Sequence, residues 1–321
     1  MIEVLRSGPA NCIQDAGRPG LLHLGISRSG AMDRLSFDMS NALLGNRPDA
    51  AAVEVAMFPF SVRSDVDTCV AVTGADARAD VDGHRLPPNW AVPVRAGAVL
   101  SLSPPDRGMR TYVAFRGGVY VPPVMGSRAT DLKSGFGGFD GRGLAKGDRF
   151  ALGEANPCRL PTAGRGAVLP ADIASDWAAL ATGAAVGVIP AAEFQDFTEG
   201  SRAQFFNANW RVGHQADRIG YRLEGPELTR TEPRELFSHG LLPGTVQVPA
   251  SGQPIIQLAD ANTCGGYPKI AAVVAPDLWK IAQLGPGGHL RFRMIEPEVA
   301  LERISAQESL IAKLRSAALA M

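Results

Sequence analysis

Glycine and proline divide this chain at short intervals, which leaves room mainly for short secondary-structure elements. Of the 321 residues, 36 are glycine and 24 are proline. Between them lie apolar, partly β-branched runs of four or five residues, at 68–72, 91–94, 99–102 and 111–115. Short apolar runs bounded by turn residues are typical of strands. The sequence therefore predicts a mainly β protein whose strands are spaced as in a barrel or sandwich.

Local turn and cap signals refine this prediction. Asp82-Gly83 stands between two short runs, and both residues tolerate positive φ, so we expect a two-residue hairpin. Helices are few: residues 35–44 follow a plausible N-cap at Asp33, residues 277–284 form a short one, and the tail 299–314 repeats apolar residues at helical spacing.

The composition changes once along the chain, which suggests two domains. Residues 153–185 carry three prolines and many alanines and glycines, with little β periodicity. We therefore predict a β-rich domain over 1–152, a linker over 153–185, a second β-rich domain over 186–297 and a C-terminal helix over 298–321.

The bulk properties exclude several functional classes. Lys plus Arg equals Asp plus Glu at 32 each, so no overall basic charge favours nucleic acid or an anionic membrane. No apolar run is long enough to span a bilayer, and the N-terminus does not resemble a signal peptide. The four cysteines form no CxxC, and the five histidines show no HxH or HExxH spacing. We expect a cytoplasmic protein with reduced thiols, no metal and no tightly bound cofactor.

The segment from Asp260 to Lys269 holds the densest set of chemically useful side chains. Asp260 follows an apolar strand-like run, where side chains reach a loop-built site. Gly265-Gly266 could expose backbone N–H groups as anion donors, and Lys269 could stabilise an anion or act as a general acid. The alternative is a tight turn with Lys269 in solvent.

Two other polar segments could contribute to the same site. At 217–223, alternation sends Arg218 and Tyr221 to opposite faces; Arg218 could pair with Asp217 or clamp a carboxylate. The glycine-rich segment 13–33 carries several polar side chains, which could line a site between two domains. Cys264 with His239 would suggest a thiol and base, although a lone cysteine is more often a core residue.

Six long motifs, in order, resemble one known family. They are IQDAGRPGLLHLGISRSGAMD, LSFDMSNALLGN, GSRATDLKSGFGGFDGRGL, ADRIGYRLEGPEL, PGTVQVPASGQPIIQLADANTCGGYPKIA and QLGPGGHLRF. Together they resemble the family of the C-type subunit of 5-oxoprolinase, the Kip antagonist, allophanate hydrolase subunit 2-like proteins and the carboxyltransferase domain of urea carboxylase. The resemblance covers roughly residues 2–297.

The resemblance implies a fold of two cyclophilin-like β-barrel domains with a few short helices and a C-terminal helix. It implies a subunit of an ATP-dependent amidohydrolase complex that converts 5-oxoproline, ATP and water to L-glutamate with B-type and A-type partner subunits. One alternative is a biotin-dependent carboxyltransferase, with biotin as its cofactor. Another is a non-catalytic antagonist that binds a Kip-inhibitor-like partner. The substrate would be a small amide or lactam.

The chain departs from the family pattern at several of these positions. Asn11-Cys12 replaces paired threonines, Ala261 stands where arginine is common, and 191–193 replaces a Gly-Pro-Gln-like turn. We expect catalytic roles for Asp260, Lys269, Asp217 and Tyr267. Substrate-binding roles are expected for Arg218, Tyr221, Gln257, Thr263, Gly265, Gly266, Gln14, Asp15, Arg18, Ser29 and Asp33.

Overall fold

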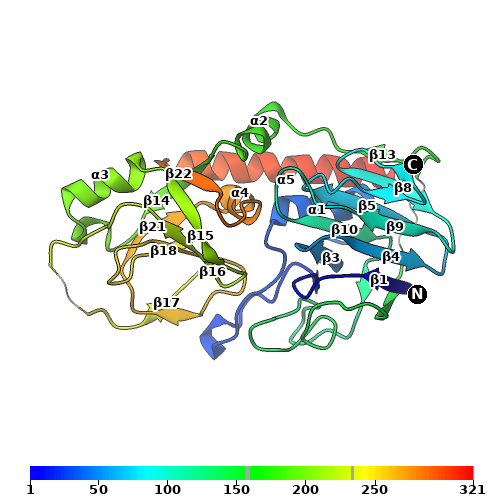
Figure 1. Ribbon diagram of the computed structural model, residues 1–321, viewed down its shortest axis with the longest axis horizontal. Helices are drawn as coiled ribbons and strands as arrows, with labels where there is room; N and C mark the ends of the chain where they lie inside the picture. The colour runs from blue at the N-terminus through cyan, green and yellow to red at the C-terminus, as the bar shows by residue number, and fades with distance from the viewer. Residues whose placement is uncertain (156–159, 233–234, 321) are drawn as a thin grey trace. The chain divides into compact units, whose positions relative to one another are not determined.

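The computed structural model describes residues 1–155, 160–232 and 235–320, and it divides the chain into two compact units (Figure 1). Unit 1 consists of Met1–Arg18, Ser29–Leu169 and Gln307–Met321, and unit 2 of Pro19–Arg28 and Pro170–Ala306. The division after Leu169 falls inside the segment 153–185 that the sequence predicted to be a linker. That segment contains strand β13 (Arg165–Gly166) and helix α2 (Ala171–Ala179).

The described part of unit 1 is built on two antiparallel sheets. Their orders are β11-β12-β1-β4-β9-β6-β7 and β13-β8-β5-β10-β3-β2. The remaining strands are β1 (Ile2–Arg6), β2 (Cys12–Gln14), β3 (Ala52–Val55), β4 (Phe60–Ser64), β5 (Thr68–Gly74), β6 (Asp80–Val81), β7 (His84–Arg85), β8 (Trp90–Val94), β9 (Val99–Leu102), β10 (Thr111–Phe115), β11 (Val119–Tyr120) and β12 (Arg149–Leu152).

Strand β10 shows why these runs form a core. All five of its residues are buried, because β3 and β5 pair with its two edges and side chains cover both of its faces. Helix α1 (Arg34–Leu43) packs its apolar face on β5 and β10, and the ring of Phe37 meets the ring of Tyr112 edge-on, with 6.1 Å between centroids. The predicted hairpin is confirmed: φ is 51° at Asp82 and 81° at Gly83.

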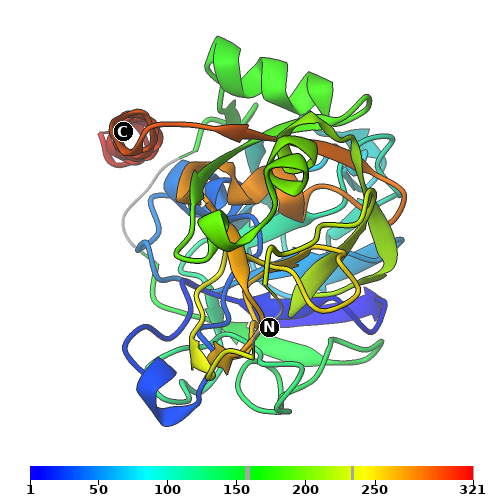
Figure 2. The same cartoon turned by 90° about the vertical axis from the view of Figure 1, so that its left-hand side faces the viewer.

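Unit 2 contains a closed barrel in the order β14-β21-β18-β19-β16-β15-β22 (Figure 2). Its strands are β14 (Ala184–Pro190), β15 (Trp210–Ala216), β16 (Gly220–Glu224), β18 (Thr245–Gln247), β19 (Ile255–Gln257), β21 (Lys269–Val273) and β22 (His289–Met294). Tyr221, Ile256, Val246 and Ala271 are register partners across four neighbouring strands, and all four are fully buried. The residues that follow the row on β19 and β18, Gln257 and Gln247, are polar and buried.

A separate two-stranded ribbon joins β17 (His239–Gly240) to β20 (Cys264–Gly265). The described α-helices that lie wholly in unit 2 are α2, α3 (Glu199–Asn207) and α4 (Leu278–Ala282), with short 3-10 turns at Leu22–Leu24, Phe194–Asp196 and Ala275–Asp277. The prediction of a mainly β fold with a C-terminal helix is confirmed, whereas α2 and α3 were not predicted.

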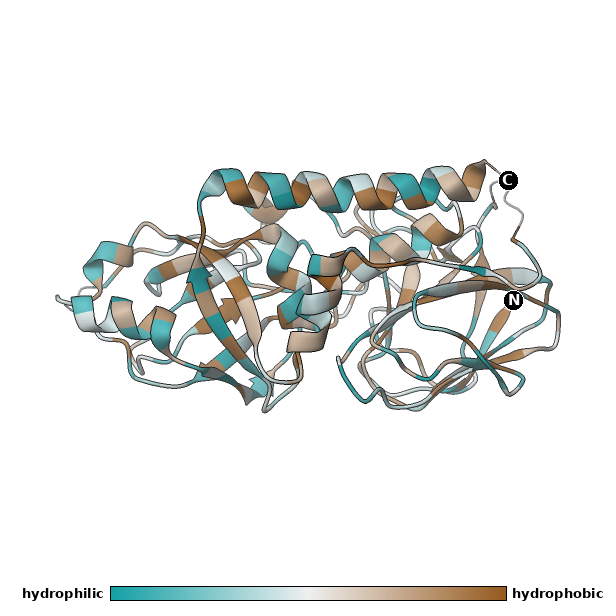
Figure 3. Cartoon of the chain, turned by 90° about the horizontal axis from the view of Figure 1, so that it is seen from above, coloured by the Kyte–Doolittle hydropathy of each residue, from teal (hydrophilic) through white to brown (hydrophobic). Residues whose placement is uncertain are grey.

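The C-terminal helix, α5 (Pro297–Leu319), begins one residue before the predicted segment 298–321 and ends two residues before its end. Figure 3 shows hydrophilic and hydrophobic bands alternating along it. Within unit 1 its last turn is fixed by the guanidinium of Arg165, which donates to the carbonyl of Ala317 at 2.9 Å. Ala318 is fully buried.

Candidate active site

A buried ion pair joins the two polar segments of unit 2 that the sequence singled out. The guanidinium of Arg218 donates to both carboxylate oxygens of Asp260, at 2.8 and 3.1 Å, and the two side chains are 8% and 1% exposed. The backbone N–H of Asp260 also donates to the carbonyl of Arg218 at 2.8 Å. The pair therefore lies just beyond the paired strands β16 and β19. Because its lone pairs are engaged by the guanidinium, Asp260 is suited to orient Arg218 rather than to accept a proton.

The structure separates the other residues predicted around Arg218. Asp217 caps a local turn, since its carboxylate accepts from the N–H groups of Ile219 and Gly220 at 2.8 and 3.1 Å. This is the ordinary Asx turn of an aspartate at a strand entrance. Tyr221 is fully buried in the apolar row of the barrel. The carboxylate that binds the guanidinium of Arg218 is thus that of Asp260, while the carboxylate of Asp217 binds backbone N–H groups.

Two buried glutamines on neighbouring strands belong to the same group of polar side chains as the ion pair. We call this group the polar layer; it consists of Arg218, Asp260, Gln257, Gln247, Lys269, His239 and Glu193. The side-chain amide of Gln257 on β19 donates to the side-chain oxygen of Gln247 on β18 at 3.0 Å. Gln247 in turn donates to the carbonyl of Tyr267 at 3.3 Å. The side-chain oxygen of Gln257 is buried and accepts no hydrogen bond from the described residues. A buried acceptor of this kind is suited to an N–H group of a ligand.

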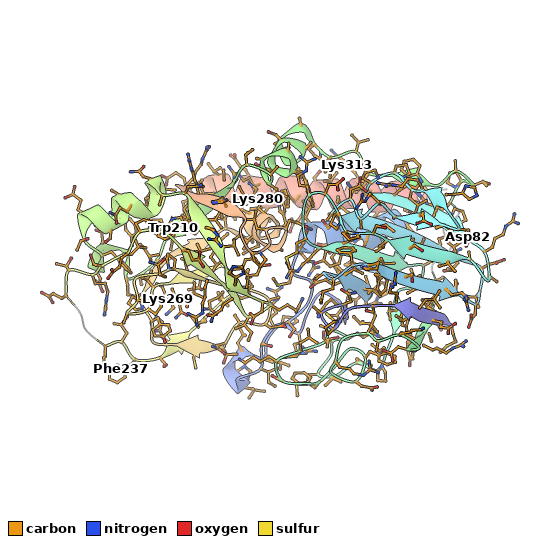
Figure 4. All side chains as sticks on the ribbon, in the orientation of Figure 1. Asp82, Trp210, Phe237, Lys269, Lys280 and Lys313 are labelled. Carbon is orange, nitrogen blue, oxygen red and sulfur yellow. The ribbon has the colours of Figure 1, made fainter. Side chains whose placement is uncertain are left out.

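The layer ends at Lys269, the register partner of Gln247 on β21. Lys269, which is labelled in Figure 4, is 8% exposed. Its Nζ contacts Nε2 of His239. The carboxylate of Glu193 accepts from the backbone N–H of Lys269 at 3.0 Å and lies 3.8 Å from Nε2 of His239. Burial lowers the pKa of Lys269, and the charge of Glu193 opposes that effect only in part. A lowered pKa makes this ammonium a stronger acid than that of a lysine in solvent.

The predicted role of Gly265-Gly266 relied on backbone conformations that only glycine adopts, and the structure of the ribbon β17–β20 does not show them. Neither glycine has positive φ. A Cβ at Gly265 would lie 3.0 Å from the amide nitrogen of Gln247, and one at Gly266 would lie 2.8 Å from the carbonyl of Leu236. A Cβ at Gly266 would therefore clash with a backbone atom, whereas one at Gly265 would displace the side-chain ends of Gln247 and Leu241; neither glycine is explained by a special backbone conformation.

The other predicted residues of this segment differ in exposure. Tyr267 is 52% exposed, Thr263 is partly buried, and the carbonyl of Thr263 accepts from the N–H of Leu241 at 2.9 Å. Cys264 carries an exposed thiol, and the imidazole of His239 is directed to Lys269. Although their strands pair, the imidazole is engaged by the amine, so the cysteine–histidine interpretation gains no support.

In unit 1 the predicted polar residues of 13–18 form a cluster of their own. The carboxylate of Asp15 accepts from the N–H of Gly17 and from the hydroxyl of Ser127, both at 2.7 Å. Gln14 donates to the carbonyl of Thr130 at 3.0 Å. The guanidinium of Arg18 lies 4.8 Å from the centre of the Phe136 ring and donates to the backbone carbonyl of Ala129. These buried side chains join two glycine-rich segments.

Ser29 and Asp33 stabilise the loop that leads into α1. Asp33 is its N-cap and accepts from the N–H of Ser36 at 2.9 Å, as the sequence predicted. The N–H of Asp33 donates to the hydroxyl of Tyr112 at 2.8 Å, and that hydroxyl donates to buried Glu54 at 2.6 Å. Ser29 is buried with φ 51°. These contacts account for Asp33 as a structural residue.

Gln247 and Glu193 were not predicted as site residues, and His239 was considered only as a base for Cys264. Gln247 had a sequence signal, because it stands between Val246 and Val248 in a predicted strand. Among the residues described, no group of three His, Cys, Asp or Glu side chains is arranged to hold a metal ion. Over the same residues, no helix has the length and apolarity to cross a bilayer.

Comparison with known proteins identifies the family of this chain. The chain belongs to the carboxyltransferase domain, subdomain A and B family, whose profile matches residues 24–294. It is 39% identical to the C-type subunit of 5-oxoprolinase from Escherichia coli (strain K12) over 308 residues, which are 96% of each chain. It is 36% identical to the C-type subunit of 5-oxoprolinase from Haemophilus influenzae, over 98% of this chain and 94% of that one.

Among solved structures, the K. lactis urea amidolyase is similar with a TM-score of 0.87 and 28% identity. The match covers 98% of this chain and 20% of that enzyme. The chain thus matches 96% and 94% of the two bacterial subunits but only 20% of the much longer urea amidolyase.

Proposed function

We propose that this protein is a subunit of an ATP-dependent amidohydrolase complex of the 5-oxoprolinase type, which opens 5-oxoproline to L-glutamate. The observation that carries the proposal is the 39% identity to a C-type subunit of 5-oxoprolinase over 96% of both chains. ATP is a co-substrate of the complex. A B-type subunit of similar fold and an A-type subunit are the partners. Cys12, Cys69 and Cys264 carry reduced thiols, which fit a reducing compartment, and we place the complex in the cytoplasm.

The polar layer of unit 2 supports this chemistry. Opening a lactam breaks a C–N bond, adds a water oxygen to the carbonyl carbon and places a proton on the leaving nitrogen. The carbonyl oxygen needs a donor, for which the guanidinium held by Asp260 is suited. The buried acceptor of Gln257 suits the lactam N–H. Lys269, with its lowered pKa, suits delivery of the proton to the leaving nitrogen.

A biotin-dependent carboxyltransferase is the second candidate, because the similarity to the K. lactis urea amidolyase extends over 98% of this chain. Carboxyl transfer from carboxybiotin to an amide nitrogen needs the same donors and acceptors around a small planar amide. The two functions differ in the carrier: only the second depends on biotin.

The experiment is to purify the chain with its partner subunits and to measure L-glutamate and ADP with 5-oxoproline and ATP. We expect both products, in an activity that avidin does not inhibit. Urea and bicarbonate with a biotinylated carrier form the second arm. Avidin-sensitive transfer to urea without glutamate release would replace the first function by the second, and no turnover in either arm would contradict both.

A further inference from the structure

Three segments of unit 2 that are distant in sequence meet at one buried amine. Lys269 begins β21, His239 begins β17, and Glu193 precedes the 3-10 turn Phe194–Asp196. Nζ of Lys269 contacts Nε2 of His239. Glu193 bridges the two, with one carboxylate oxygen 3.0 Å from the backbone N of Lys269 and the other 3.8 Å from Nε2 of His239.

The other ring nitrogen of His239 determines its tautomer. Nδ1 lies 2.9 Å from the carbonyl oxygen of Phe237. A carbonyl can only accept, so Nδ1 carries the proton in the neutral ring, and Nε2 presents its lone pair to Lys269. The contact is therefore one in which the lysine ammonium donates and the imidazole accepts.

The two side chains differ in their access to water. Lys269 is 8% exposed, whereas the side chain of His239 is 44% exposed. Burial also lowers the pKa of Lys269, so its amine loses a proton more easily than a lysine in solvent. Across the sheet, β18 places the uncharged Gln247 beside Lys269, and the part of β14 paired with β21 is apolar. Among the described residues, Glu193 and His239 are the ionisable side chains in contact with Lys269.

We propose that His239 is a positioning residue that takes a proton from the buried amine of Lys269 and passes it to solvent, with Glu193 as the counter-charge of the imidazolium. In the step, an N–H bond of the ammonium breaks, its electron pair stays on Nζ, and the proton bonds to Nε2 of His239. The imidazolium then releases a proton to water, and the reverse sequence reloads the amine. The use of this amine in turnover rests on the proposed function, but the exchange itself does not.

The first test uses the full chain without substrate. The chain has five lysines, so trace acetylation with acetic anhydride, quantified by mass spectrometry across pH, follows each amine separately. In the wild type we expect Lys269 to deprotonate at lower pH than the exposed Lys313, because burial disfavours the charged form of its amine.

The variant His239→Gln keeps a hydrogen-bonding side chain that cannot carry a proton. It should move the midpoint of the Lys269 curve by at least about half a pH unit, while the Lys313 curve stays unchanged. Glu193→Gln should move the midpoint of the Lys269 curve to lower pH, since the charge of Glu193 raises the pKa of this amine. A Lys269 curve that matches Lys313, or one that His239→Gln leaves unchanged, would overturn the relay.

The second test is the pH dependence of kcat/KM in the reconstituted complex. His239→Gln should remove one limb of the profile, which a merely structural substitution would not do; His84→Gln, at an exposed site of unit 1, is the matched control. If labelling shows the coupling and the complex releases no glutamate, the proposed function fails and the relay stands. If labelling shows no coupling, the relay fails whatever the turnover.

Discussion

The ion pair between Arg218 and Asp260 gives the strongest stability prediction, because both side chains are almost completely buried. The substitution Asp260→Asn keeps the shape of the side chain, removes the charge and turns an N–H₂ group toward the guanidinium. Breaking a buried ion pair by removing one partner costs about 3–5 kcal/mol, since the remaining charge stays buried without compensation. At a urea m value of about 2 kcal/mol/M, the unfolding midpoint of unit 2 should fall by about 1.5–2.5 M.

The tryptophans make the two units distinguishable in this assay. Trp177, Trp210 and Trp279 lie in unit 2 and Trp90 lies in unit 1, so urea unfolding followed by fluorescence in a Trp90→Phe background reports on unit 2. Separate probes matter because a chain of two units need not unfold in one step.

The matched control is the exposed pair of Arg211 and Glu224 on the same barrel, whose side chains are 44% and 51% exposed. Glu224→Gln should change stability by less than about 1 kcal/mol. A double-mutant cycle of Arg218→Met with Asp260→Asn should give a coupling energy of at least about 2 kcal/mol. If Asp260→Asn shifts the midpoint no more than Glu224→Gln, or if the cycle is additive, the buried pair does not stabilise the barrel as argued.

Three further predictions concern unit 1, each measured by denaturant unfolding followed by Trp90 fluorescence in a variant that lacks the unit 2 tryptophans. Tyr112→Phe should cost about 2–3 kcal/mol, because it leaves the buried carboxylate of Glu54 without its hydroxyl donor; a cost below about 0.5 kcal/mol would contradict this. Burial raises the pKa of Tyr112 well above 10.0. The contribution of its neutral hydroxyl to the free energy of unfolding should therefore be complete below pH 10 and decrease as the pH rises further, whereas Tyr112→Phe should lack this decrease. Gly30→Ala should destabilise more than Gly97→Ala, since both have φ near 88° but only Gly30 has backbone atoms within 3 Å of the new Cβ; equal costs would refute the steric argument.

Local signals predicted much of the secondary structure. The runs 99–102 and 111–115 coincide with β9 and β10, because branched apolar residues bounded by turns leave little choice but a strand. Asp33 is the N-cap of α1 for the physical reason behind its prediction: a side-chain oxygen is placed to accept from an orphan N–H of the first turn.

Helix α3 shows where such signals end. It contains Gly200, and of its residues only Ser201 and Phe205 are buried, so no apolar periodicity marks it. The one clue is Thr198, whose side chain accepts from the N–H of Ser201 as an N-cap. Helix α2 likewise buries only Ile173 within its bounds.

The sequence predicted several of the site's residues, but not which of their side chains contact one another. Asp260 and Arg218 are 42 positions apart, and they meet because β16 pairs with β19 in a register that local sequence does not encode. His239 reaches Lys269 through a ribbon of two-residue strands, which is too short to give a periodic pattern. Contacts that depend on long-range register therefore had to come from the structure.

The most direct test of the proposed function is the activity of Lys269→Met in the reconstituted complex with 5-oxoproline and ATP. Lys313→Met, at an exposed position of α5, is the control. The account predicts that Lys269→Met retains complex formation and loses glutamate release by at least about 100-fold, in the range expected for loss of a general acid, while the control keeps full activity. Glutamate release by Lys269→Met at the wild-type rate would contradict it.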